Sequence, residues 1–110
     1  MNIKILQLDH NIEEAEMLLF RDYDFTKRKY PNKNDLLKLY KEVYEIEDYQ
    51  SKTMDTSDKS ICNDIFTDFN IHRPEDFRGH SLSVSDIIQI DDKYYYVDDI
   101  GFAEVNYFIR

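Results

Sequence analysis

The segment 58–69 is the part of the sequence that most restricts the fold, because it is an amphipathic helix pattern. Its apolar residues recur three and four positions apart, as on one face of a helix: Ile61, Cys62, Ile65, Phe66 and Phe69. Polar residues occupy the opposite face: Asn63, Asp64 and Asp68. Ser57 or Asp58 can cap the first turn, and Asn70 suits a left-handed conformation after the last turn. We therefore predict one main amphipathic helix over about 58–69.

The last third of the chain is typical of β structure. Apolar and aromatic residues fill 86–90 and 94–98, and the turn formers Asp91-Asp92-Lys93 lie between them, which predicts a β-hairpin. Segment 102–109 offers apolar side chains for a final strand or a packed tail: Phe102, Val105, Tyr107 and Ile109. Pairing between the two ends of the chain would close the sheet.

The first half of the chain predicts shorter elements. Segment 2–8 reads as a half-buried strand, and Asn11 followed by Glu14 matches the start of a short helix. Segment 23–30 has no clear period. Segment 34–47 fits a helical face and also an alternating strand, and we favour a helical turn at 34–38 with a strand at 40–47. The predicted fold class is α+β, with a small mixed or antiparallel sheet, the C-terminal hairpin, the main helix and additional short helices.

Length and composition indicate a single domain over 1–110. A chain of 110 residues with 42% hydrophobic content can build one core and needs neither disulfides nor a metal for stability. Its lone cysteine, Cys62, suits a reducing compartment. No apolar run approaches the roughly 20 residues that a membrane crossing requires. We expect a cytoplasmic protein.

The charge is distributed unevenly. The formal net charge is −9, yet 21–41 holds seven basic and three acidic residues, so this stretch is +4 and the remainder is −13. One interpretation is that two solvated faces merely differ in sign, and the other is a dipolar surface that steers a basic partner to the acidic side. The overall acidity argues against direct binding of nucleic acid or anionic membranes.

The residue types that could take part in catalysis or metal binding are better explained by structural roles. The run Gly79-His80-Ser81-Leu82-Ser83 lacks the second glycine of a nucleophile elbow, so its serines are expected to shape a turn. His72, His80, Asp76 and Cys62 have no metal-ligand spacing, and His80 is expected to hold the loop through a ring hydrogen bond to a backbone carbonyl. We predict no catalytic residue, no metal and no cofactor, since the two glycines stand apart and form no phosphate loop.

The acidic pairs and the tyrosines of the hairpin are candidate surface residues. Asp91-Asp92 and Asp98-Asp99 are expected in turns and on solvent faces, with Asp98 the best suited of the four to a specific structural partner. Tyr94 and Tyr96 share one face of their strand, and Tyr95 shares the other with Val97. One set is expected to pack inside while the other is available outside.

Two segments, 69–88 and 95–102, resemble the YodL-like domain family, and 5–8 and 40–44 resemble weaker upstream parts of the same pattern. The motif residues, expected to be structural, are Gly79, His80, Ser81, Ser83, Ser85, Asp86, Gly101 and Phe102. The resemblance implies a domain found largely in conjugative and other mobile elements of low-GC Gram-positive bacteria, often within large multidomain proteins, with no known shared enzymatic activity. One family member is associated with interference with the bacterial actin-like cytoskeleton, and small proteins of such elements often inhibit host defences, including CRISPR nucleases.

These observations lead to a non-enzymatic binding protein as the leading hypothesis. The favoured role is an inhibitor of a host defence protein, such as a CRISPR effector nuclease, acting through an acidic surface. A regulator of the actin-like cytoskeleton and an accessory structural domain of conjugative elements are the alternatives, and an enzyme using Ser81 or His80 ranks below them. Monomer and homodimer both stay open. The candidate partner-binding residues are Asp86, Asp91, Asp92, Asp98, Asp99, Glu104, Tyr94 and Tyr96.

Overall fold

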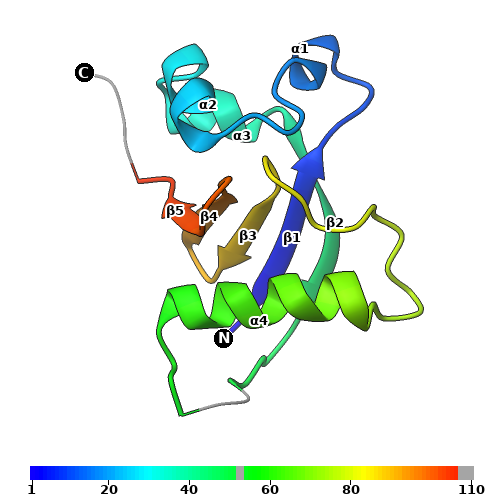
Figure 1. Ribbon diagram of the computed structural model, residues 1–110. Coiled ribbons are helices and arrows are strands. Elements are labelled where there is room, and N and C mark those ends of the chain that lie inside the picture. Colours follow the sequence, from blue (N-terminus) through cyan, green and yellow to red (C-terminus); the bar gives the residue numbers. More distant parts are fainter. Residues whose placement is uncertain (52–53, 107–110) are drawn as a thin grey trace.

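A computed structural model describes residues 1–51 and 54–106, and within them one antiparallel sheet lies between helices (Figure 1). The strands run in the order β2-β1-β3-β4-β5. Their bounds are β1 (Ile3–Leu8), β2 (Tyr40–Ile46), β3 (Ile87–Ile90), β4 (Lys93–Val97) and β5 (Phe102–Glu104). All four strand pairings are antiparallel, so the predicted α+β class is confirmed and the sheet is antiparallel rather than mixed.

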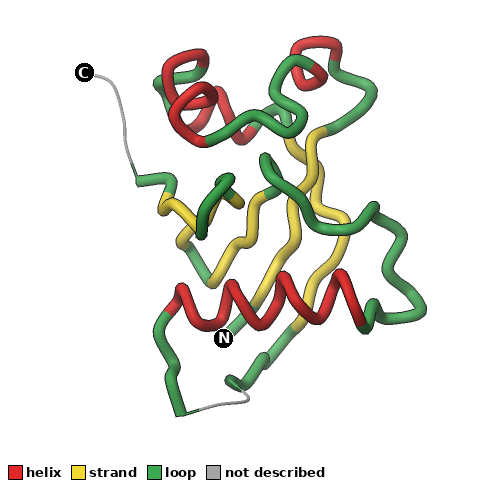
Figure 2. Tube along the Cα trace, viewed as in Figure 1, coloured by secondary structure: helices red, strands yellow, loops and turns green. Residues whose placement is uncertain are grey.

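Helix α4 (Asp58–Ile71) covers one face of the sheet, which Figure 2 shows as a single long helix crossing the strands. Its buried residues Ile61, Cys62, Ile65 and Phe69 pack on a core that β1, β3 and β4 build from Ile3, Ile5, Ile88, Ile90, Tyr95 and Val97. The Ser57 hydroxyl accepts the backbone N–H of Ser60 at 3.3 Å, as the capping pattern predicts. The helix continues through Ile71, however, so the left-handed conformation expected at Asn70 is wrong.

Three short helices pack on the opposite face, at the end of the sheet where β1 finishes (Figure 1). They are α1 (Glu13–Glu16), α2 (Tyr23–Lys29) and α3 (Lys33–Leu37). The expected Asn11 cap is wrong, because α1 begins after Ile12 without a side-chain cap. Segment 23–29, which has no readable period, is a helix that Asp22 caps by accepting the Phe25 N–H at 2.8 Å.

Covering both faces changes the expected exposure of the hairpin tyrosines. Tyr95, Tyr96 and Val97 are 5%, 0% and 3% exposed, and Tyr94 is half-buried. The prediction that one face of this strand stays open to solvent is therefore wrong. Tyr95 points toward α4, whereas Tyr96 points toward the short helices.

The two ends of the chain do meet in the sheet, although not through the last strand. β1 pairs with β3 of the hairpin, whose turn is Asp91–Asp92, while β5 pairs with β4 and with no other strand of the described residues. Of the predicted final strand, 107–109 lies outside the described residues.

Cys62 lies on the buried face of α4 and has no exposed surface. Burial raises the pKa of its thiol to about 12, so the thiolate form is strongly disfavoured at neutral pH. In the described parts of the chain, no helix combines the length and the apolar character that crossing a bilayer requires.

Candidate functional site

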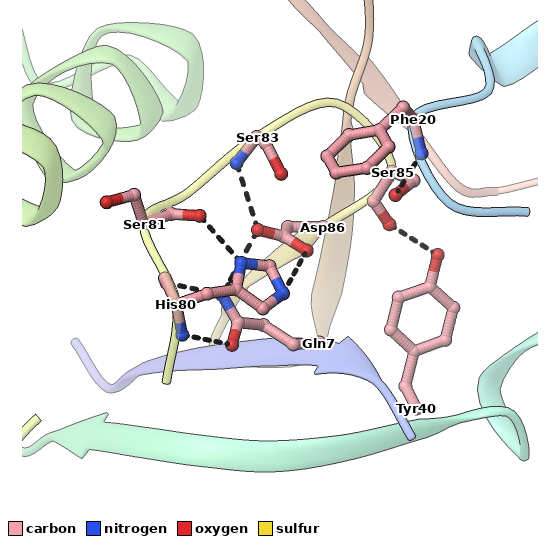
Figure 3. Close-up of polar contacts among 8 residues, drawn as sticks. All are labelled: Gln7, Phe20, Tyr40, His80, Ser81, Ser83, Ser85 and Asp86. Carbon is pink, nitrogen blue, oxygen red and sulfur yellow. Dashed lines mark hydrogen bonds and ion pairs between the residues drawn. The ribbon is translucent and has the colours of Figure 1, made fainter. Parts of the chain in front are cut away.

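The motif of the loop before β3 joins Gln7 in a polar cluster with His80 and Asp86, in which Gln7 and Asp86 are buried and His80 is exposed (Figure 3). Gln7 comes from β1 and is only 2% exposed. Its amide nitrogen donates to the His80 carbonyl at 2.8 Å and to the Asp86 carboxylate at 3.2 Å, and its amide oxygen accepts the His80 N–H at 3.2 Å. One β1 side chain therefore fixes the loop that leads into β3. We call these three residues the polar cluster.

Asp86 is the most deeply buried charge-bearing group of the polar cluster, at 1% exposed. Burial raises the pKa of its carboxyl to about 7, against the opposing effects of the Ser83 N–H bond at 3.0 Å, of His80 and of Gln7. The His80 ring lies alongside, with Nε2 4.0 Å from Asp86 Oδ1. Asp86 is therefore a group that can exchange a proton near neutral pH.

His80 holds the loop as the sequence predicts. Its Nδ1 lies 2.8 Å from the Ser81 carbonyl oxygen, a contact that requires the hydrogen to sit on Nδ1. Nε2 is then the ring nitrogen that faces the Asp86 carboxylate. The expected ring hydrogen bond to a backbone carbonyl is confirmed.

The motif serines are engaged in the same loop (Figure 3). The Ser85 hydroxyl accepts the Phe20 N–H at 3.2 Å, and the Ser85 carbonyl accepts the Tyr40 hydroxyl at 2.6 Å. Ser83 donates its N–H to Asp86, and Ser81 is exposed and offers its carbonyl to His80. The contacts tie the loop to the α1–α2 connection and to β2, as expected of a turn-forming motif.

The two glycines of the motif have different reasons to be glycine. A Cβ at Gly79 would lie 2.5 Å from Gln7 Oε1 and 2.9 Å from the Phe77 ring, so the polar cluster requires a residue without a side chain there. Gly101 has open space but a φ of +75°, which favours glycine in the turn before β5. Phe102, next in sequence, packs edge-on against Phe66 of α4 with ring centroids 6.1 Å apart.

Two of the candidate partner-binding residues are corrected by their burial. Asp86 belongs to the polar cluster and is shielded from any partner. Tyr96 is 0% exposed, and its hydroxyl lies 2.7 Å from the Thr26 hydroxyl and donates to the Arg21 carbonyl at 2.7 Å. Strand alternation alone places Tyr96 on a face of β4, but it does not reveal that each face is covered.

The other candidates do not form one surface. Asp91 and Asp92 are exposed in the hairpin turn, at one end of β4, and Asp98 and Asp99 follow its other end. The Asp98 carboxylate accepts the Tyr23 N–H at the start of α2, at 2.9 Å, which is the structural partner expected for it. Glu104 and Tyr94 are half-buried, and Lys33 lies over the Tyr94 ring at 5.3 Å.

Sequence reasoning missed the residues that extend the acidic hairpin turn. Asn2 donates its N–H to the Asp91 carboxylate at 2.9 Å, and its side-chain oxygen accepts the Asp48 N–H at 3.3 Å. The turn after β2 therefore lies beside the hairpin turn. We call the exposed residues Glu47, Asp48, Asp91 and Asp92 the acidic end. The only available signal was that both turns are acidic, because Asn2 is far from either in sequence.

The opposite end of the sheet carries the basic residues. Lys27, Arg28 and Lys29 are exposed on α2, and Lys38 follows α3. Figure 1 places these two helices at the end of the sheet away from the hairpin turn. The basic stretch of the sequence thus lies at the other end of the sheet from the acidic end, although α1 at that same end adds Glu13, Glu14 and Glu16.

A surface hollow of about 400 Å³ lies beside the polar cluster, lined by Gln7, His10, Lys41, Arg78 and His80 among others. Its lining offers hydrogen-bonding groups from the Gln7 amide, the imidazoles and the basic side chains. Among residues 1–51 and 54–106, no three His, Cys, Asp or Glu side chains converge in a way that could hold a metal ion.

The sheet, its two helical coverings and the polar cluster define a small antiparallel α+β domain whose sequence motif is built into its core. The chain belongs to the YodL-like domain family, whose profile it matches over residues 2–108. It is also 34% identical over 84 residues to the uncharacterized protein R785 of Acanthamoeba polyphaga mimivirus, a match that covers 76% of this chain and 66% of that protein. No solved structure is significantly similar.

Proposed function

We propose that this domain is a non-enzymatic binding protein of a mobile genetic element, acting in the cytoplasm as an inhibitor of a host defence protein. The most specific candidate target is a CRISPR effector nuclease. The observation that carries the proposal is the acidic end, where Asn2 holds two acidic turns together at the opposite end of the sheet from the basic helices.

The physical argument is electrostatic complementarity. Exposed carboxylates grouped on one end of a compact domain attract a basic surface and favour its approach to that end. CRISPR effectors hold guide and target strands in positively charged channels, so an acidic domain of this size can compete for such a channel. Among the ion pairs of the described residues, none of the acidic-end carboxylates has a lysine or arginine partner. Glu42, by contrast, is paired with Lys4 at 3.4 Å.

The test is effector cleavage and guide loading in the presence of excess purified protein. Inhibition is expected, and the double variant Asp91→Asn with Asp92→Asn should weaken it at least tenfold. Asp99→Asn is the matched control, because Asp99 is an exposed aspartate at the other end of β4. Unchanged cleavage and loading with the wild-type protein would contradict the proposal.

Membership of the family also supports a regulator of the bacterial actin-like cytoskeleton as the alternative. Expression in a rod-shaped bacterium separates the two, since rounding or bulging of the cells is expected only of the cytoskeletal regulator. An accessory structural domain of conjugative elements would leave both effector cleavage and cell shape unchanged.

A further inference from the structure

Strand β2 ends the sheet on one side and leaves an open edge. It lies first in the order β2-β1-β3-β4-β5 and, within residues 1–51 and 54–106, pairs only with β1. The backbone N–H and C=O groups that point away from β1 are arranged to receive another strand. An open edge of this kind is a common way to bind an extended peptide, which then adds a strand to the sheet.

An apolar groove lies directly beside this edge, between β2 and the C-terminal half of α4. Its volume is about 470 Å³, and its apolar walls are Tyr44, Ile46, Ile65, Phe69 and Pro74. Tyr44 packs on Phe69 with ring centroids 5.4 Å apart, and both rings contact Phe77. The groove is therefore built on packed aromatic side chains and can receive one apolar side chain without rearrangement.

Acidic side chains surround the groove. Asp68 lines it, and Asp76 accepts the Tyr44 hydroxyl at 2.8 Å. Glu47 is exposed just after β2, where the groove approaches the acidic end. The basic contribution to this rim comes from the loop after α4, which holds His72 and the exposed Arg73. The rim is therefore net acidic at neutral pH.

We propose that the β2 edge and this groove bind an extended segment of the partner, which adds a sixth strand and places one apolar side chain between β2 and α4. Lysine or arginine residues flank that side chain and face the acidic rim. This inference rests on the proposed function in that the partner is a protein with a basic surface. It adds the conformation of the bound segment and the side chain that anchors it.

The probe is a set of short synthetic peptides with a central leucine, isoleucine, phenylalanine or methionine between valines and with lysines at both ends. Titration into the isotopically labelled full chain should shift the backbone amide resonances of β2 and the side-chain resonances of Ile46 and Ile65. The same peptides with glutamates at both ends should bind at least tenfold more weakly. Peptides with a proline at the centre should not bind, because proline has no backbone N–H to donate to β2.

Groove variants carry the second arm of the experiment. Ile46→Ala should weaken peptide binding at least tenfold, and Asp68→Asn should weaken it less and reduce its salt dependence. The matched controls are Ile100→Ala and Asp99→Asn, because both residues are exposed in the turn between β4 and β5 at the other side of the sheet. Amide spectra of each variant establish that the fold is kept.

The outcomes separate this inference from the proposed function. Equal binding of lysine- and glutamate-flanked peptides, shifts away from β2, or no binding by any peptide would overturn the inference. A dimer in solution that shifts the β2 amides without peptide would overturn it too, since a second copy would then occupy the edge. Inhibition that depends on Asp91 and Asp92 but not on Ile46 would support the proposed function and overturn this inference.

Discussion

The two faces of the sheet are covered in different ways. On the α4 face, aliphatic and aromatic side chains from one regular helix meet Ile3, Ile5 and Ile88 in a core with few polar atoms. On the other face, three short helices bury fewer apolar side chains, and tyrosine hydroxyls bond to backbone carbonyls between the helical layer and the sheet. Tyr96 donates to the Arg21 carbonyl before α2, and Tyr23 donates to the Glu104 carbonyl at 3.2 Å.

The difference teaches which part of the stability each face supplies. Burial of apolar surface is non-directional and tolerates small shifts. The position of α4 is therefore stabilised mainly by the apolar area that it buries against the sheet. Helices of four to seven residues are too short to be stable by themselves, so their position depends on directional bonds from the sheet. Breaking each kind of contact should therefore have a different signature.

The largest effect is expected from Ile61→Ala on the α4 face. Ile61 has no exposed surface, and removing three carbons there leaves a cavity that lowers the free energy of unfolding by about 2–5 kcal/mol. Urea denaturation followed by circular dichroism measures the loss. Because α4 is held by area, the whole domain should lose stability in one transition, and a selective loss of α4 signals would contradict the comparison.

Asp86→Asn should remove a pH dependence that the polar cluster imposes. The folded pKa of Asp86 is raised from 3.8 to about 7, so its contribution to stability is fully present below about pH 4 and is lost as the pH rises through 7. At about 1.4 kcal/mol per pKa unit the difference is several kcal/mol. An asparagine can still accept the Ser83 N–H, so the variant should match the wild type at pH 4 and exceed it at pH 8.

Denaturation at a series of pH values provides the comparison between variant and wild type. Asp99→Asn, which changes an exposed aspartate, serves as the control and should follow the wild-type curve. Parallel curves for Asp86→Asn and the wild type would show that Asp86 is ionised throughout this pH range.

A smaller loss is expected from Tyr96→Phe on the other face. The variant keeps the ring but leaves the Arg21 carbonyl and the Thr26 hydroxyl without this partner, at a cost of about 1–3 kcal/mol. Hydrogen exchange should accelerate most in Tyr23–Lys29. Uniform acceleration across α2 and α4 would mean that the two faces are not held differently.

Asp98→Ala should have the smallest effect. The carboxylate accepts the Tyr23 N–H at the start of α2, and losing such an acceptor costs about 1 kcal/mol. Thermal denaturation should show a small decrease, and Asp98→Asn should lie between the alanine variant and the wild type. An equal decrease for both would point to the negative charge rather than to the hydrogen bond.

The same contrast explains what could be read from the sequence. α4 and the β3–β4 hairpin were predictable because their periodicity is local. α2 was not, because its anchors are Tyr96 and Asp98, more than seventy residues away. The burial of Asp86 was hidden for the same reason, since its partner Gln7 is 79 positions earlier. The α1–α3 face also explains the wrong expectation for Tyr96, because three weak helical patterns gave no sign of a second covering layer.

Cys62 gives the domain a practical advantage for all of these measurements. It is the single cysteine of the chain, it has no exposed surface, and its thiol is held in the unreactive protonated form. A cysteine introduced at an exposed position such as Ile100 should therefore take up a maleimide fluorophore selectively while the native domain is intact. Binding at the acidic end or at the β2 edge could then be followed by fluorescence without first removing the natural thiol.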